Sequence, residues 1–437
     1  MTRAIRAISL KPIKLAHIKS IIIWALALLM VYQTGVLWLV SITSRTFLFN
    51  YLPFMHQTAI PDGADSLVSP WRIITEHGDG RFSVQYSDLA ASESRRYGDK
   101  VLSHLFQSGA YVAAHRLLNM DDFRLAYIYE YAFPMEAEWF THGFGQRNNL
   151  LTSRITAPFR QVVILPPLSG IEDAAVFFIA ENGYAYEFSV TPPTVGGFDT
   201  VIPEEATGAY YIWVGQQLNK FIRHGNFTFS GVRRINPYED RGNLFIRSIQ
   251  DGISVFFSNP LGINYHTEGD VWRFNDANIV VRYYDTHVLE LINYRSVDRN
   301  APQTFLNDYT AAARFLAADH LINNETYLAG FREEEGKHIF YFNYVINNTP
   351  MIMQPNWPRG VNMPHPIIIT VDHGTVVHYR KIAFNFEAKQ ERSTASANFV
   401  NPENHEFILL GYRMGDRDVE ATHWLADGRI LPVPILR

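Results

Sequence analysis

The feature that most constrains this chain is an uncharged apolar run near its N-terminus, from Ile21 to Val40. At about 1.5 Å of rise per residue, about 20 helical residues span the ~30 Å hydrocarbon layer of a bilayer. A buried core helix usually shows a polar face, and a signal peptide has a shorter apolar region of about 7–15 residues before a small-residue cleavage site. We therefore predict a retained transmembrane helix over residues 20–42, with a cleaved signal peptide as the alternative.

The charges that flank this run predict its orientation. Five basic residues and no acidic residue precede it, whereas Arg45 is the basic residue that follows it closely. The five are Arg3, Arg6, Lys11, Lys14 and Lys19. Basic flanks stay in the cytoplasm, so we expect residues 1–19 to form a cytoplasmic stub and the region after the helix to be extracellular. The prediction is a single-pass protein of the cell membrane.

Composition excludes several classes of function. Without the five basic residues of the stub, 33 basic residues face 43 acidic ones, which gives the exported part a formal charge near −10. That charge argues against nucleic acid as a partner and against docking on anionic lipid beyond the anchor itself. The chain has no cysteine, which excludes disulfides, thiolate metal sites and cysteine nucleophiles. An exported chain without disulfides favours a Gram-positive cell surface.

The region after the anchor is long enough for several domains of about 100–200 residues. A Pro-rich stretch from Pro192 to Pro203 reads as a linker, and a third unit begins near Asn300. We predict an α+β fold of antiparallel sheets with packed helices. The predicted units are residues 43–195, 196–298 and 299–437.

Local patterns predict the elements of these units. An apolar face at helical spacing predicts a helix over 92–108, and Asn307 is the expected cap of a second helix. The Asn182-Gly183 pair predicts a tight turn between strands 175–180 and 184–190. Further strands are expected at 80–86, 127–133, 162–165, 242–247, 253–257, 279–284, 287–292, 338–346, 367–371 and 376–384, with more between 406 and 435. Pro134 is expected to end the strand 127–133.

No catalytic motif stands in the sequence, neither a serine-nucleophile signature nor a zinc-protease motif nor a phosphate-binding loop. His365, His373 and His378 bracket a predicted hairpin, but strand histidines are more often polar face residues than metal ligands. Glu130 lies among strand tyrosines, where a glutamate usually points to solvent or pairs with an arginine. The run Glu333 to Glu335 reads as a solvated turn beside a glycine. We expect no catalytic residue, no metal and no cofactor.

Polar residues inside the anchor are the remaining signal. Gln33 and Thr34 lie mid-span beside Gly35, and an amide in hydrocarbon tends to face another helix. The residues expected to contact a partner helix are Leu26, Met30, Gln33, Thr34, Gly35 and Leu37. A tolerated glutamine in a monomeric anchor is the alternative.

The whole layout resembles the YycH family, in which a basic stub and one helix precede a cysteine-free ectodomain of α+β units. The stretches that carry the resemblance are Tyr32–Trp38, Phe47–Tyr51, Tyr129–Pro134, Phe342–Ile352, Ile369–Arg380, Gly411–Arg413 and Trp424. They match the family's strand, short turn and hairpin patterns. Asn348 replaces the usual turn glycine, and Thr422-His-Trp424 stands where a Pro-Ala-Trp-like ending is expected. These departures indicate a divergent member.

The resemblance implies a regulatory function. YycH-like proteins are membrane-anchored regulators of the WalK (YycG) sensor histidine kinase, and they pair with a YycI-like single-pass protein. We therefore expect a non-enzymatic regulator of a two-component system that controls cell-wall metabolism through transmembrane helix contacts and the ectodomain. The alternatives are a membrane-anchored cell-wall hydrolase, which would need two carboxylates about 5–10 Å apart, and an extracytoplasmic ligand-binding module.

Overall fold

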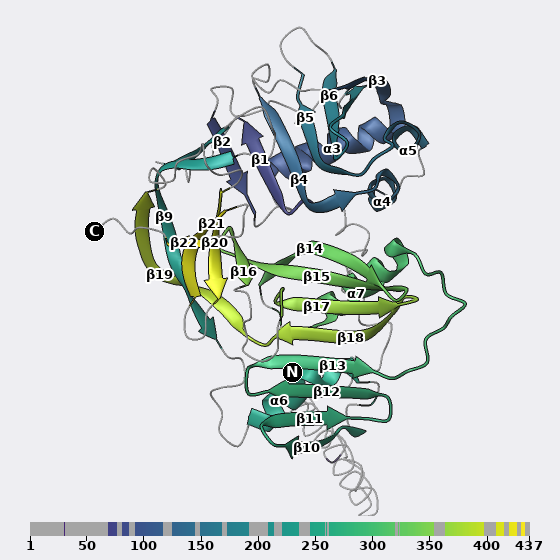
Figure 1. Cartoon of the computed structure of the whole chain (residues 1–437), viewed down its shortest axis with the longest axis vertical. Coiled ribbons are helices and arrows are strands. Elements are labelled where there is room, and N and C mark those ends of the chain that lie inside the picture. The colour runs from purple at the N-terminus through teal and green to yellow at the C-terminus, as the bar shows by residue number, and fades with distance from the viewer. Residues whose placement is uncertain are drawn as a thin grey trace, which may run out of the picture. The chain divides into compact units, whose positions relative to one another are not determined.

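The computed structural model divides the chain into two units, Met1–Ala59 and Ile60–Arg437. The residues that it describes are 30, 69–76, 81–86, 92–116, 125–144, 149–167, 173–191, 209–213, 221–235, 245–257, 259, 262–319, 322, 324–353, 363–396, 408–414, 419–425 and 430–432. Apart from Met30, all of them belong to the second unit, whose strands form three connected sheets (Figure 1). This sheet-rich α+β architecture confirms the predicted fold class for the described residues of the second unit.

The first sheet is antiparallel and lies in the order β8-β2-β1-β4-β5-β6-β7-β3. Its strands are β1 (Arg72–Glu76), β2 (Arg81–Gln85), β3 (Ala110–His115), β4 (Ala126–Met135), β5 (Phe159–Leu165), β6 (Ala174–Ala180), β7 (Ala185–Val190) and β8 (Ala209–Trp213). The predicted hairpin at Asn182-Gly183 joins β6 to β7, and Gly183 takes the positive φ of +81° that such a turn requires. Pro134 does not end β4, because a register irregularity before Met135 accommodates the missing N–H of proline.

Three helices accompany this sheet, namely α3 (Glu93–Ser108), α4 (Ala137–Gly143) and α5 (Asn149–Arg154). The prediction of α3 is confirmed. Ser92 caps it, because its Oγ accepts a hydrogen bond from the backbone N–H of Arg95 at 3.1 Å. Gly98 lets the helix approach β4 closely, since a Cβ at this position would collide with the hydroxyl of the fully buried Tyr129.

The C-terminal sheet is also antiparallel and has the order β10-β11-β12-β13-β18-β17-β15-β14. Its strands are β10 (Asn264–Glu268), β11 (Val271–Asn275), β12 (Ile279–Tyr284), β13 (Val288–Asn293), β14 (Glu325–Glu334), β15 (Lys337–Ile346), β17 (Ile367–Asp372) and β18 (Thr375–Ile382). Strands from both sides of residue 298 pair directly at β13–β18. The predicted unit boundaries themselves stay predictions.

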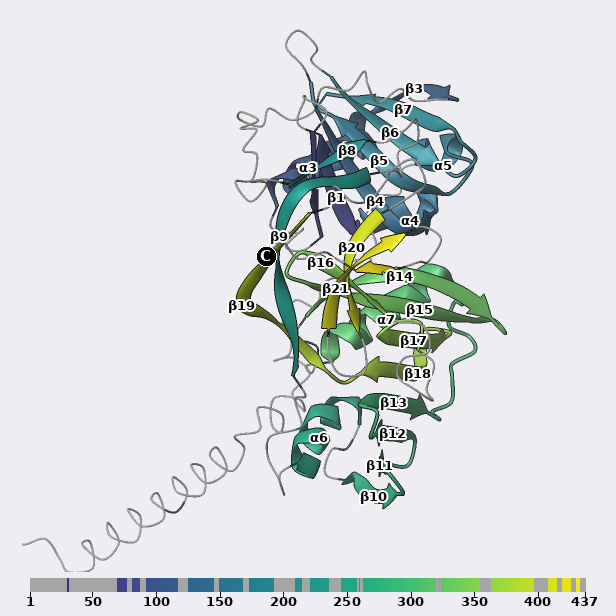
Figure 2. The ribbon, with the colours of Figure 1, turned by 60° about the vertical axis from the view of Figure 1, so that its left-hand side comes forward.

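Two helices, α6 (Phe245–Ile253) and α7 (Phe305–Ala318), lie on one side of the C-terminal sheet (Figure 2). The strands predicted at 242–247 and 253–257 are wrong in their described part, because residues 245–247 and 253 lie in α6 and residues 254–256 form a 3-10 helix, η5 (Ser254–Phe256). The aromatic and β-branched run favoured a strand, but Ile249 and Ile253 are spaced for one buried helical stripe. The predicted cap Asn307 is also wrong. Thr304 caps α7, and its Oγ1 accepts the N–H of Asn307 at 3.3 Å.

A connecting sheet joins the other two. It contains β9 (Phe221–Ile235), β16 (Thr349–Met353), β19 (Asn385–Ser396), β20 (Ile408–Met414), β21 (Val419–Leu425) and β22 (Ile430–Pro432). β9 pairs with β8 of the first sheet and with β19. β16 pairs with β15 of the C-terminal sheet in an antiparallel hairpin and with β20 in parallel. Because β9 and β16 each extend into a neighbouring sheet, the three sheets share one hydrogen-bonded network.

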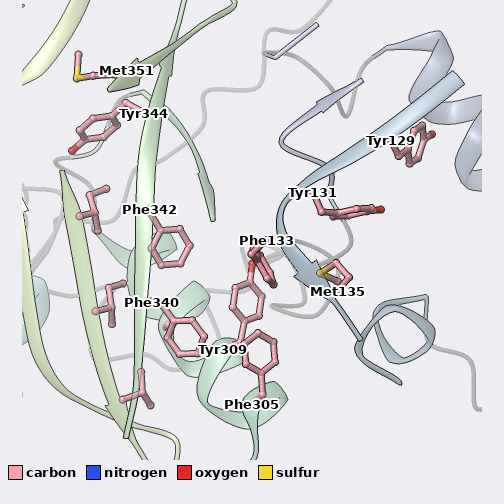
Figure 3. Packing of buried hydrophobic residues seen from close by; sticks show 14 of the residues in the cluster. Tyr129, Tyr131, Phe133, Met135, Phe305, Tyr309, Phe340, Phe342, Tyr344 and Met351 are labelled. Carbon is pink, nitrogen blue, oxygen red and sulfur yellow. The ribbon is translucent and has the colours of Figure 1, made fainter. Parts of the chain in front are cut away.

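The aromatic core runs through the second unit without a break between β4 and α7. Figure 3 shows Phe133 of β4 pointing toward Phe305 of α7, and their ring centroids lie 6.5 Å apart. Trp139 of α4 stacks on the same Phe305 at 3.9 Å. Aromatic pairs of this kind add about 0.5–1.5 kcal/mol each beyond the burial of their area. The first sheet and the C-terminal sheet are therefore packed as parts of one core.

Candidate functional site

The residues expected to contact a partner helix fall outside the described part of the chain, except for Met30. Met30 is helical and 71% exposed. Leu26, Gln33, Thr34, Gly35 and Leu37 are not described. Within the described residues, no helix is both long enough and apolar enough to cross a membrane. The contact role of these six residues stays a prediction.

Glu130 lies opposite Arg72 in the β1–β4 ladder and pairs with it. Pairing with an arginine was one of the two arrangements expected for this strand glutamate. Nη2 of Arg72 donates to both carboxylate oxygens, at 2.9 and 3.0 Å. Trp71 Nε1 donates to Oε1 at 3.3 Å, and Gln161 Nε2 donates to Oε2 at 3.1 Å. Both oxygens are thus occupied by donors from this chain, which argues against a role in proton transfer to a substrate.

The guanidinium of Arg72 is almost completely buried, at 1% exposure. Burial disfavours its charge, but the Glu130 carboxylate and Tyr86 more than offset that effect, so the pKa of Arg72 is raised above its ordinary value. Nη1 of Arg72 donates to the Tyr86 hydroxyl at 3.2 Å. The arginine is therefore a permanent buried cation whose charge is balanced within the first sheet.

The same cluster reaches the C-terminal sheet. The backbone N–H of Tyr86 donates to Oδ1 of Asn348, which lies in the turn between β15 and β16. Trp71 packs against Tyr86 and Tyr327, with ring centroids 5.3 and 5.5 Å away. We call this group the junction cluster; its members are Trp71, Arg72, Tyr86, Glu130, Gln161, Tyr327 and Asn348. It fixes where the first sheet meets the β14–β15 end of the C-terminal sheet.

The turn between β15 and β16 contains Asn347 and Asn348, at the position where the YycH-like pattern expects a glycine. Both residues have positive φ, +49° and +55°. Asparagine tolerates this left-handed conformation better than other residues with a side chain. Unlike glycine, Asn348 also supplies an acceptor for Tyr86. The substitution thus keeps the turn and adds a contact across the junction.

The three histidines of the predicted hairpin have three different partners. Nδ1 of His365 lies 2.8 Å from Oδ1 of Asn343, and burial lowers the pKa of His365 to about 4. His373 pairs with the adjacent Asp372, and His378 pairs with Glu290 on β13. In the parts of the chain that the structure describes, no three metal-ligating side chains gather into a site. The acidic run ends in a hairpin turn, where Glu335 and Gly336 have positive φ.

Buried charges also occur on the inner face of the C-terminal sheet, which we define as the face covered by α6 and α7. Nζ of Lys381 and the Tyr379 hydroxyl each lie 2.5 Å from Oδ2 of Asp319, at the C-terminal end of α7. Burial lowers the pKa of Lys381, although Asp319 opposes that shift. Asp308 of α7 similarly contacts His338 and the backbone N–H of Gly374. These groups tie α7 to the strands beneath it.

The outer face of the C-terminal sheet, opposite α6 and α7, carries a different polar set that the sequence analysis missed. Strand register places Arg273, Arg282, Glu290 and Arg380 side by side on β11, β12, β13 and β18. Each residue is unremarkable in its own segment. The signal was the single charged residue inside each of the otherwise uncharged strands β11, β12 and β13, but the neighbours become visible only once β13 is paired with β18.

Glu290 is the carboxylate at the centre of this outer-face set. It lies 3.1 Å from Nε2 of His378, accepts from the Tyr284 hydroxyl at 2.7 Å and from Arg282 at 3.3 Å, and faces Arg380 Nε at 3.9 Å. The hydrogen bond from His378 is the largest influence on it. Together with the hydrogen bonds from Tyr284 and Arg282, this bond outweighs the effect of burial and lowers the pKa of Glu290 to about 2. The site is built to hold a carboxylate in its charged form.

The sequence matches no protein-family model and no curated protein. The structure is similar to the crystal structure of YycH from Bacillus subtilis, with a TM-score of 0.51 and 11% sequence identity. The similarity covers 84% of this chain and 96% of that one. At this identity the likeness concerns the fold. The chain therefore has a YycH-like fold.

Proposed function

We propose that this chain is a non-enzymatic regulator of a two-component sensor histidine kinase that controls cell-wall metabolism. The observation that carries the proposal is the YycH-like fold, which extends over 84% of the chain. The family patterns around Phe342–Ile352 and Ile369–Arg380 lie in β15–β18 and their turns, so the resemblance in sequence and the likeness in fold concern the same strands. Together they support a regulatory role at the membrane.

The two carboxylates that would be the first candidates for catalysis instead support a non-enzymatic role. Glu130 accepts four hydrogen bonds from its own chain, and Asp319 is held by Lys381 and Tyr379. A hydrolase of the paired-carboxylate type would need two acids open to a substrate about 5–10 Å apart. Neither of these groups is open in that way, and binding rather than catalysis is the function that we assign.

In this proposal the anchor helix, residues 20–42, transmits the regulatory effect inside the bilayer. Gln33, Thr34 and Gly35 contact helices of the kinase and of a YycI-like single-pass partner, while the ectodomain lies outside the cell. A bias of about 1–3 kcal/mol between two kinase states changes their ratio about 5- to 150-fold. A modest helix–helix contact is therefore sufficient for regulation.

The test is to replace Gln33 by Leu in cells that carry the cognate kinase. The matched control is Val31→Leu, because residue 31 lies on the opposite side of a helix with 3.6 residues per turn. We expect Gln33→Leu to change the output of kinase-controlled genes and to reduce photocrosslinking from the neighbouring position 34 to the kinase, at unchanged protein level. Val31→Leu should change neither. Equal output and equal crosslinking in all three strains would refute the helix contact.

A further inference from the structure

The outer face of the C-terminal sheet holds two arginines next to each other, and among the described residues each has one carboxylate contact, Arg273 with Glu268 at 3.8 Å and Arg282 with Glu290 at 3.3 Å. Arg273 on β11 and Arg282 on β12 are directly opposite in the ladder. Like charges in this arrangement destabilise a sheet. The guanidinium of Arg273 makes no hydrogen bond with any described residue, and its nearest acid, Glu268, is 3.8 Å away on a largely exposed side chain. Its Nε is buried and unpaired.

The cationic set continues along the same row. Arg282 and Arg380 flank Glu290 from the two neighbouring strands, and His378 approaches the same carboxylate. All of these basic side chains are between 21% and 35% exposed, so each keeps part of its surface open to solvent. Arg282, Arg380 and His378 thus share one central carboxylate, and Arg273 lies 3.8 Å from a second, Glu268.

This surplus of positive charge does not follow from composition, because the whole chain carries a formal charge of −5. The arginines belong to β11 and β12, which are consecutive in the sequence, and to β18, which comes from a distant part of the chain and pairs with β13. Arginine matches carboxylates with a planar fork of donors and is less strongly hydrated than lysine. The row is therefore suited to an anionic partner.

We propose that this outer face binds an extended, carboxylate-rich segment of a partner protein, with Arg273 and Arg282 as the principal contacts. Glu290 shows that the same basic set already accommodates a carboxylate. Strands lie about 4.8 Å apart, so the row from β11 to β18 is about 14 Å long; an extended peptide places side chains i and i+4 about 13 Å apart. Acidic residues at alternate positions of such a segment would follow the row.

This surface adds to the proposed function and is separable from it, because it concerns the ectodomain and not the anchor helix. The probe is a fluorescein-labelled peptide of six glutamates, titrated by anisotropy with the full chain in nanodiscs of neutral lipid. We expect Arg273→Gln/Arg282→Gln to weaken binding about tenfold or more, which corresponds to about 1.4 kcal/mol. Gln33→Leu should leave this binding unchanged whether or not it alters kinase output.

The matched control is Arg160→Gln/Arg233→Gln, which removes the same charge from two exposed, salt-bridged arginines elsewhere. Thermal unfolding verifies that both double variants fold. Equal weakening by both pairs would show non-specific attraction and overturn the proposal, as would wild-type protein that does not bind the peptide. Inorganic polyphosphate and unlabelled hexaglutamate are compared as competitors of the labelled peptide at equal concentrations of negative charge. Stronger competition by polyphosphate would assign the face to a phosphate polymer and overturn the proposal of a protein segment.

Discussion

The two faces of the C-terminal sheet differ in how their charged side chains are balanced. On the inner face, Lys381 meets Asp319 at 2.5 Å and His338 meets Asp308 at 2.7 Å, both beneath α7. On the outer face, the basic side chains outnumber the carboxylates, and Arg273 makes only a distant contact with Glu268 among the described residues. The inner pairs are matched and serve the fold. The surplus of basic side chains on the outer face lowers the stability of the fold, and this cost indicates that the surplus serves to bind a partner outside the chain.

The largest expected effect is on the inner face. Lys381→Met removes the ammonium partner of the fully buried Asp319, and breaking a buried pair in this way costs about 3–5 kcal/mol in the free energy of unfolding. Urea unfolding measures the loss. Replacement of both partners, Lys381→Met/Asp319→Leu, should recover most of it, because no charge remains buried. A single variant as stable as the wild type would show that the inner pair does not stabilise the fold.

The next effect concerns His365, whose ring packs against that of Tyr341 in a tilted arrangement, with the ring centroids 4.8 Å apart. Because burial lowers its pKa to about 4, below the ordinary 6.5, the unfolded state binds the proton more readily. The stability that depends on neutral His365 is complete above pH 6.5 and is lost as the pH falls toward 4. The loss is on the order of 3 kcal/mol.

Unfolding measured between pH 7 and pH 4 tests this dependence. His365→Gln keeps a donor for Asn343 but does not titrate, so its stability should fall less with pH than that of the wild type. His142→Gln, at an exposed position of α4, is the control and should behave as the wild type does. Parallel pH profiles for all three proteins would contradict the assignment.

The local elements were predictable from the sequence where short-range signals were strong. An apolar face at helical spacing identified α3, and Asn182-Gly183 identified the β6–β7 turn. The signals failed where a short apolar run was compatible with both helix and strand. Residues 245–256 are helical because α6 and η5 pack on the inner face, and Phe256 stacks on Phe315 of α7 at 5.1 Å. That partner is distant in sequence.

The polar clusters were less predictable for the same reason. The sequence indicated that Glu130 would either point to solvent or pair with an arginine, and the partner, Arg72, is 58 residues away. The row from Arg273 to Arg380 depends on β18 lying next to β13, and His378 is 88 residues from Glu290. Spacing within one segment cannot reveal such neighbours, because they are set by the register of the whole sheet.

A third prediction concerns the end of the outer face that the junction cluster covers. Asn348→Ala places a methyl side chain at φ +55° and removes the acceptor for Tyr86, so it should cost about 2 kcal/mol in the free energy of unfolding. Asn348→Gly loses the acceptor without the strain and should cost about half as much. Chemical denaturation of the two variants distinguishes these terms. Equal costs would mean that backbone conformation contributes nothing here.

The smallest expected effect is on the open part of the outer face, and it is the sharpest test of the comparison. Arg282 is one-third exposed and its contact with Glu290 is screened by solvent, so Arg282→Gln should change the free energy of unfolding by less than about 1 kcal/mol. Arg273→Gln should be neutral or slightly stabilising, because it relieves the repulsion between the two arginines. If either variant instead unfolded as readily as Lys381→Met, the outer arginines would be structural like the inner pair, and the surplus of charge would no longer point to a partner.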